Sequence, residues 1–231
     1  MLDPLSRSDA VLTAIETRKS VRGFLDRSVP LPIVSRLLEA ASRAPSGSNT
    51  QPWRIHVMTG VAKDRLSAAI LAERAIQTVE PETPYKYYPD TWPDRYLARR
   101  RQVGWALYGL LGIEKGDRVR TRAWHDRNFE FFGAPVGLIF TLDRRLALGA
   151  LIDVGMFAQN IMTAAQAIGL ATCPQAAFAH HNETVNHTLG LADDEMVLFG
   201  MALGFEDLNA VQNELVTPRA PVSEFALFHH E

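Results

Sequence analysis

The chain has 231 residues, of which 47% are hydrophobic and 22% charged, a composition that suits one domain with a sizeable core. The formal net charge is -2, and the basic run Arg99–Arg101 is short. Charge therefore gives no reason to expect binding to nucleic acid or to an anionic membrane surface. The sequence shows neither a secretory leader nor a run of roughly 18 apolar residues, and it has one cysteine, so we expect a cytoplasmic protein without a membrane span.

Two helices are predicted at the start of the chain. Apolar residues at helical spacing indicate a short first helix that ends near Arg18, with Ser8 or Asp9 as its N-cap. The second helix carries Pro32 in its first turn and one apolar stripe, and it stops before Pro45.

A strand and a third helix are predicted next. In residues 53–58 the side chains of Trp53, Ile55 and Val57 alternate with more polar ones, which predicts a half-buried strand. The pattern over residues 62–78 then favours a helix.

The middle of the chain holds a segment without periodicity. Residues 80–92 are rich in proline and tyrosine and predict an ordered surface excursion, which extends with the following helix to about residue 128. Later elements are expected as a helix over 94–112, a buried strand over 136–142, a helix over 149–168, a short helix over 183–189 and a buried strand over 195–205.

Three features of this second half bear on assembly and packing. The helix over 149–168 is apolar on nearly every side, so it belongs at the centre of the protein or in a subunit interface. Gly200 and Gly204 are expected to interrupt the last strand. The tail over 212–231 has no core of its own, and the whole chain, 1–231, is interpreted as one domain.

The segment RKSVRGF, residues 18–24, is the first candidate site. In an extended chain Arg18, Ser20 and Arg22 project to one side, and guanidinium groups bind phosphate oxygens through two parallel hydrogen bonds. The segment therefore suits a phosphate and its adjoining polyol. A solvated polar connector would have the same composition.

The loop RAPSGSNTQPW, residues 43–53, is the second candidate site. Its small polar side chains leave room for a flat polar heterocycle to approach the backbone closely. A helix stop followed by a capped turn explains Pro45 and Gly47, but it explains the length of the loop less well.

Together with QNIMTAAQAIGLATCP, residues 159–174, these motifs resemble the nitroreductase family of flavin enzymes over most of the chain. The resemblance implies an α+β fold, in which helices flank a central, mostly antiparallel sheet, and an intertwined homodimer with FMN at its interface. It also implies that NAD(P)H supplies hydride and that a nitroaromatic, quinone or similar acceptor is reduced in a ping-pong exchange.

The resemblance assigns roles in FMN binding to the basic residues and their neighbours. Arg18 and Arg219 would face the phosphate, with Lys19 beside them, and Ser20 would contact the phosphate or the ribityl chain. Arg22 would face the pyrimidine edge of the flavin ring, where a fixed cation stabilises the negative charge of the reduced state.

The resemblance also assigns residues to the flavin ring. Pro45, Ser46 and Ser48 would line the isoalloxazine. The stretch Pro174, Gln175, Ala176 and Ala177 would pass the ring, with the backbone N–H of Ala176 or Ala177 as donor to flavin N5. No catalytic side chain is expected, because the flavin carries the reactivity.

Several alternatives remain open from the sequence. The same scaffold suits reductive dehalogenation or enone reduction, and a flavin-binding protein with little turnover or a nucleotide-binding module without flavin would share some of these motifs. Arg99, Arg100 and Arg101 would either bind an anionic substrate or form a solvated helix face. Aromatic side chains in and after the excursion would either cover the flavin as a lid or pack the excursion down: Tyr85, Tyr87, Tyr88, Trp92, Tyr96, Phe131 and Phe132. The excursion is the expected source of substrate selectivity. Cys173 is expected to be packed and inert, and no metal site is expected, since the histidines lack ligand spacing.

Overall fold

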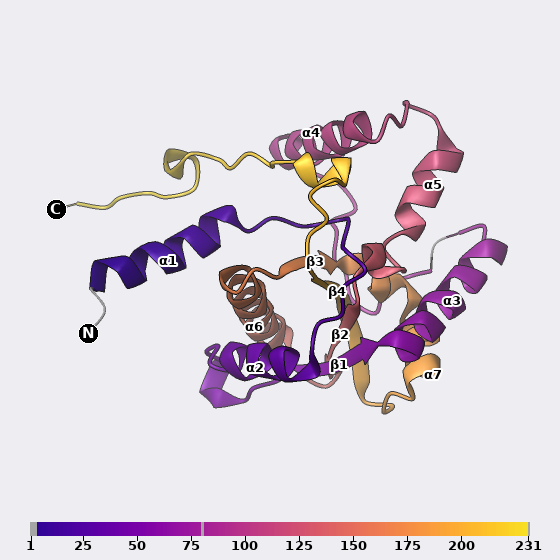
Figure 1. Cartoon of the computed structure of the whole chain (residues 1–231), viewed down its shortest axis with the longest axis horizontal. Helices are drawn as coiled ribbons and strands as arrows, with labels where there is room; N and C mark the ends of the chain where they lie inside the picture. Colours follow the sequence, from indigo (N-terminus) through magenta and orange to yellow (C-terminus); the bar gives the residue numbers. More distant parts are fainter. Residues whose placement is uncertain (1–3, 80, 231) are drawn as a thin grey trace.

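The protein, seen in a computed structural model that describes residues 4–79 and 81–230, has one four-stranded sheet with helices on both faces (Figure 1). The helices are α1 (Pro4–Thr17), α2 (Leu31–Ala41), α3 (Gly60–Ile76), α4 (Asp94–Leu110), α5 (Arg118–Asp126), α6 (Leu148–Ala167) and α7 (Asn182–Leu189). The strands are β1 (Arg54–Thr59), β2 (Val136–Asp143), β3 (Ala171–Gln175) and β4 (Glu195–Gly204). The predicted α+β class is confirmed.

The sheet has the strand order β1-β2-β4-β3, and every neighbouring pair is antiparallel. Strand β3 was not predicted, because it is short and contains Pro174. Proline lacks the N–H that a central strand needs, but it is tolerated at an edge, and β3 lies at the end of the strand order. The mostly antiparallel sheet that the resemblance implies is confirmed.

Both faces of the sheet are covered by apolar side chains. Alternate residues of one strand belong to different clusters: Leu138 of β2 packs in a cluster with α2 and α6, whereas Ile139 packs in a cluster with α3 and α7. In Figure 1, α2 and α6 accordingly lie to one side of the strands and α3 and α7 to the other. The double covering explains why the predicted alternation in β1 was wrong at its end, where Met58 is 3% exposed and Val57 is 37% exposed.

The expectation that Gly200 and Gly204 interrupt the last strand was also wrong, because β4 runs continuously through Gly200 and ends at Gly204. A Cβ atom at Gly200 would lie 2.4 Å from Cδ2 of Phe178, and one at Gly204 would lie 2.6 Å from Cδ of Pro135. The two glycines therefore let neighbouring rings pack directly on the strand.

The helix boundaries differ from the predicted ones in two instructive places. Helix α1 begins at Pro4, so Ser8 and Asp9 lie inside it rather than at its N-cap. Helix α5 was predicted only as a polar stretch, since three of its nine residues are arginines and it shows no clear apolar stripe. Its N-terminus is marked by Asp117, whose side chain accepts a hydrogen bond from the backbone N–H of Arg120.

Helix α6 is the one helix of the described residues that is long and apolar enough to cross a membrane by length and composition, a test that the core helix of a soluble protein also passes. It packs instead against α2, α1 and β3. Only 39% of its most apolar window is buried within one chain. Leu148 and Ile152 are 72% and 66% exposed, so much of its apolar surface has no cover in a single chain.

Candidate functional site

The basic segment that follows α1 runs along the outer edge of β3. Ser20 pairs with Thr172 as a parallel bridge, and the N–H of Val21 donates to the carbonyl of Thr172 at 3.0 Å. Four residues further on, Phe24 forms an antiparallel bridge with Glu206. The segment is therefore extended, as predicted, and it is fixed to the sheet by backbone hydrogen bonds.

Asn213, from the start of the tail, holds the same segment from its other side. Its Oδ1 accepts from the backbone N–H of Arg22 at 2.7 Å, and its Nδ2 donates to the carbonyl of Gly23 at 2.8 Å. The side chain of Gln212 donates to the carbonyl of Arg22 at 2.9 Å. These residues were missed, because they act across about 190 positions of sequence and no local pattern marks them.

Two arginines face a cavity of about 700 Å³ at this point. Arg18 and Arg219 both line it, and burial, followed by the nearby charge of Arg219, holds the pKa of Arg18 below its usual value. Nε of Arg18 is buried and has no hydrogen-bond partner among the described residues. The other lining residues are Ile15, Glu16, Thr17, Lys19, Gln159, Val216 and Thr217.

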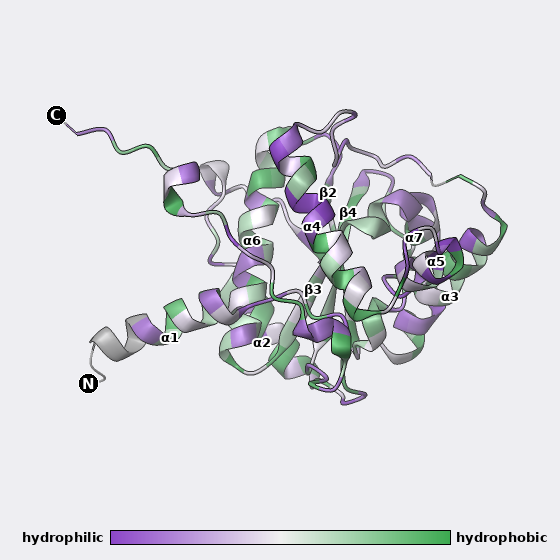
Figure 2. Cartoon of the chain, turned by 90° about the horizontal axis from the view of Figure 1, so that it is seen from above, coloured by the Kyte–Doolittle hydropathy of each residue, from purple (hydrophilic) through white to green (hydrophobic). Residues whose placement is uncertain are grey.

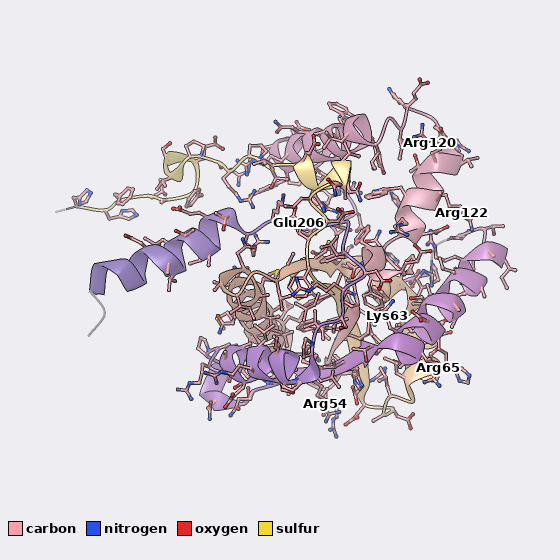
Figure 3. The ribbon with its side chains drawn as sticks, in the orientation of Figure 1. Arg54, Lys63, Arg65, Arg120, Arg122 and Glu206 are labelled. Carbon is pink, nitrogen blue, oxygen red and sulfur yellow. The ribbon has the colours of Figure 1, made fainter. Side chains whose placement is uncertain are left out.

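The charges around this cavity suit an anion. Lys19 is already engaged, since its Nζ lies 2.7 Å from Oε1 of Glu206 and donates to the carbonyl of Asn213 at 2.6 Å (Figure 3 labels Glu206). Arg18 and Arg219 repel each other across the cavity. One carboxylate, that of Glu16, also lines the cavity, but it forms no ion pair with either arginine among the described residues. A phosphate would satisfy the unpartnered Arg18 Nε and offset the repulsion, so the residues fit the phosphate of FMN.

Arg22 lies at the other end of the segment. Its guanidinium is half-buried and donates from Nη1 to the carbonyl of Ser20 at 3.3 Å. Its charge also acts on Cys173: burial raises the pKa of that thiol to about 11, and Arg22 offsets part of the rise. Cys173 is 2% exposed and protonated at neutral pH, as expected for a packed, inert thiol.

The loop over residues 43–53 adopts an unusual backbone. Ser48, Asn49 and Gln51 have φ values of 50°, 58° and 49°, in the left-handed region that side chains other than glycine rarely adopt. Inside the loop, the hydroxyl of Ser46 accepts from the N–H of Gln51 at 3.0 Å. Three strained residues within four positions indicate that the loop serves a purpose other than connection.

A single chain does not join this loop to the basic segment. The cavity beside Arg18 includes no residue of the loop, and no described hydrogen bond or ion pair links the two. The structure therefore brings Arg18, Lys19 and Arg219 together at the cavity, with Ser20 and Arg22 further along the same extended segment. It places Pro45, Ser46 and Ser48 apart from them, in a loop that is bonded to α6.

The expected donor to the flavin ring lies just after β3. Ala176 and Ala177 open a short 3-10 helix (Ala176–His181), and the first N–H groups of a helix have no partner inside it. Gln175 is buried and donates from Nε2 to the carbonyl of Asn128 at 2.6 Å, whereas Pro174 is exposed. Both alanines are half-buried, so either N–H remains a candidate.

The three consecutive arginines of α4 do not act together. Arg99 pairs with Glu224 of the tail at 2.6 Å, and Arg100 lies over the rings of Tyr88 and Trp92, 5.4 and 5.3 Å from their centroids. The aromatic residues of the excursion therefore form a cluster with Arg100. Tyr85 anchors this cluster to the sheet by donating its hydroxyl to the carbonyl of Leu198.

The described histidines, cysteine and carboxylates form no group of three that would hold a metal ion. His56 and His181 instead pair with carboxylates: His56 Nε2 lies 2.9 Å from Glu195 Oε2, and His181 Nδ1 lies 2.9 Å from Glu73 Oε2. These pairs lie within the fold and link separate elements.

Known proteins agree with this arrangement. The model of the "Nitroreductase family" matches residues 15–205. Chloronitrobenzene nitroreductase of Comamonas testosteroni is 42% identical over 219 residues, which cover 94% of this chain and 96% of that protein. 4-Nitrobenzoate reductase of Pseudomonas putida is 39% identical over 215 residues, which cover 93% of each.

Solved structures give the same result. The FMN and NADPH-dependent nitroreductase NfnB from Sphigopyxis sp. strain HMH superposes with a TM-score of 0.92 at 35% identity, over 96% of this chain and 99% of that chain. A family match over most of the sequence, with relatives and structures of this similarity, shows that the chain belongs to the nitroreductase family.

Proposed function

We propose that this chain is an FMN-dependent oxidoreductase that takes hydride from NAD(P)H and reduces nitroaromatic compounds. The observation that carries the proposal is the pair Arg18 and Arg219, a partly buried and an exposed cation that line one cavity and form no ion pair with a carboxylate among the described residues. The relatives named above add the reaction class, since they are named for the reduction of chloronitrobenzene and 4-nitrobenzoate.

The bound flavin would supply the hydride chemistry, and the protein would supply orientation and electrostatics. Arg18 and Arg219 hold the phosphate, and Ser20 holds the phosphate or the ribityl chain. Arg22 lies two residues further along the same extended segment and places its charge at the pyrimidine edge. The backbone N–H of Ala176 or Ala177 donates to the ring, while Pro45, Ser46 and Ser48 line its face.

The complete site requires a homodimer in this proposal, because one chain keeps the loop apart from the basic segment. Helix α1 and the tail both extend to one side of the molecule, away from the sheet (Figure 2). Both expose apolar side chains there: Val11 and Leu12 of α1 are 56% and 53% exposed, and Phe225 and Leu227 of the tail are 70% and 85% exposed. A partner chain that covers these residues would bring its own loop to the basic segment.

The dimer proposal is tested by light scattering on the full chain and on a chain that ends at Asn213. We expect a dimeric full-length protein, and a shortened chain that is monomeric and without flavin. A monomeric full-length protein, or a shortened chain that stays dimeric and keeps its flavin, would contradict the proposal.

Substrate selectivity is assigned to the excursion, residues 80–128, whose aromatic cluster differs in character from the flavin-binding segments. The two substrates would use one site in turn, in a ping-pong exchange. We place the enzyme in the cytoplasm, where NAD(P)H is available.

An acceptor screen on the purified protein tests the proposed reaction. Oxidation of NADPH and of NADH is followed with nitrobenzene, 4-nitrobenzoate, a quinone, an enone and a halogenated phenol. We expect the fastest turnover with a nitroaromatic acceptor. Faster turnover with the enone or the halogenated phenol would favour the corresponding alternative, and negligible turnover with every acceptor would indicate a flavin-binding protein.

A further inference from the structure

One face of α6 holds the strained loop at three separate points. Oδ2 of Asp153 accepts a hydrogen bond from the backbone N–H of Gly47 at 3.1 Å. The ring of Phe157 stacks on Trp53, with centroids 4.7 Å apart and planes 9° from parallel. Asn160 donates from Nδ2 to the carbonyl of Ala41 at 3.3 Å, where the chain leaves α2.

The spacing of these three α6 residues makes them one surface. Positions 153, 157 and 160 are four and three residues apart, so their side chains lie on the same side of the helix. Asn160 contacts the end of α2 just before the loop, Asp153 contacts the first turn of the loop, and Phe157 contacts its last residue. Helix α6 is therefore the support on which the loop is built.

The loop needs such support because its own contacts are few. Three residues with positive φ within four positions are unfavourable, and they persist only where the surroundings hold them. The described internal bonds run from Gln51 N–H to the Ser46 hydroxyl, from Gln51 Nε2 to the Asn49 carbonyl, from Asn49 N–H to the Ser46 carbonyl and from Thr50 N–H to the Gly47 carbonyl. None of these ties the loop to the rest of the protein.

Asp153 is the conspicuous member of this surface. It is 8% exposed and lies in the most apolar helix of the chain, where an ionised side chain is costly unless it is bonded. It is the sixth residue of α6, too far from the helix start to act as a cap or to be stabilised by the helix dipole. Helix stability therefore does not account for it, whereas its hydrogen bond to Gly47 does.

We infer that Asp153 is a positioning residue for the cofactor: it fixes the Gly47 N–H and so sets Ser46 and Ser48, on either side of Gly47, against the flavin ring. This role rests on the proposed function. It assigns no contact between Asp153 and the flavin, and it requires an acceptor oxygen at this position rather than a negative charge.

The acceptor side of the bond is tested with Asp153→Ala and Asp153→Asn. In the flavin-free protein, hydrogen exchange of the amides of residues 47–51 should speed up at least tenfold in Asp153→Ala and about twofold at most in Asp153→Asn, which keeps an acceptor oxygen. The dissociation constant of FMN should rise about tenfold in Asp153→Ala and stay within about threefold in Asp153→Asn. Asp64→Ala is the matched control, because Asp64 is exposed on α3 and, among the described residues, its ion pair is with Lys63, at 3.0 Å.

The donor side is tested with Gly47→Pro, which removes the N–H that Asp153 binds. The backbone admits proline, since Gly47 is the first residue of a short 3-10 helix and Ser46 before it is extended. The proline Cδ would replace the hydrogen and overlap Oδ2 of Asp153, which lies 3.1 Å from the nitrogen, so the double variant with Asp153→Ala, which removes this overlap, is the decisive comparison. Gly47→Ala keeps the N–H, and its Cβ would meet nothing closer than Oδ2 of Asp153, at 3.9 Å. We expect Gly47→Pro to weaken FMN binding as much as Asp153→Ala, the double variant to be no worse than either, and Gly47→Ala to bind like the unmodified protein.

The outcomes separate this role from the proposed function. Unchanged exchange in Asp153→Ala, unchanged FMN affinity despite faster exchange, or an Asn variant as weak as the Ala variant would each overturn the role of Asp153 alone. Failure of the unmodified protein to bind FMN would overturn the proposed function and this role with it. If Asp153→Ala does not fold, the FMN affinities of Asp153→Asn, Gly47→Pro and Gly47→Ala still test whether the hydrogen bond positions the loop.

Discussion

Arg18→Met is expected to weaken FMN binding without destabilising the flavin-free protein. Arg18 is partly buried, its Nε has no described partner, and Arg219 repels it, so in the absence of an anion its charge contributes nothing favourable to folding. With the phosphate bound, the same guanidinium donates to a charged group, a contribution of about 1.5 to 3 kcal/mol. The dissociation constant of FMN should therefore rise roughly 10- to 150-fold. Methionine keeps the length of the side chain, so packing is largely retained.

The assay combines fluorescence titration of FMN with urea unfolding of the flavin-free protein. Arg36→Met is the matched control, because Arg36 is exposed on α2 and its ion pair in the described part of the chain is with Glu39, at 2.7 Å. The control should change neither quantity by more than about 0.5 kcal/mol. FMN affinity within twofold of the unmodified protein, or a loss of folding free energy as large as the loss of binding free energy, would show that Arg18 is a structural residue and refute the reasoning.

Three further predictions concern other parts of the chain. Arg22→Leu, saturated with FMN, should lower the two-electron midpoint potential by roughly 30 to 65 mV, because a cation at the pyrimidine edge stabilises the reduced state by about 1.5 to 3 kcal/mol; an unshifted potential in a potentiometric titration would remove that role. Gly200→Ala should lower the free energy of unfolding by about 1 to 3 kcal/mol, since the added methyl group would overlap the ring of Phe178, and an unchanged urea midpoint would contradict the packing account. Burial opposes ionisation of Glu73, but its side-chain hydrogen bonds outweigh burial and hold its pKa below the ordinary value of 4.5. The stability that ionised Glu73 contributes is complete above pH 4.5 and is lost as the pH falls through the lower pKa of the folded state. In Glu73→Gln the free energy of unfolding should therefore fall less steeply with pH in the acid range. An unchanged acid dependence would contradict the lowered pKa of Glu73.

The elements that the sequence predicted well are those whose burial has a clear period. Helix α2, with its single apolar stripe, and β2, with its continuous apolar run, appear close to their predicted bounds. Strand β3 and helix α5 were missed for opposite reasons. β3 owes its place to pairing with β4, a tertiary contact that overrides an unfavourable proline, and the arginines of α5 conceal its periodicity.

Only those parts of the candidate site that lie in local sequence motifs could be predicted. The extended basic segment and the unusual loop were both indicated by their residue types. The residues that hold the segment and the loop in place were not predicted. Asn213 is hydrogen-bonded to the segment from the other end of the chain, and Asp153 is hydrogen-bonded to the loop from a helix 106 positions away. Spacing along the sequence also gave no sign that a single chain keeps the two motifs apart, because that depends on how α6 and β3 are placed in space.

The most direct test of the account is the identity and amount of flavin bound to the purified full-length protein. Flavin released by denaturation and identified chromatographically should be FMN, at about one per chain, and anaerobic NADPH should bleach the bound form. Recovery of FAD, or of no flavin after incubation with excess FMN, would contradict the central claim that Arg18 and Arg219 bind the phosphate of FMN.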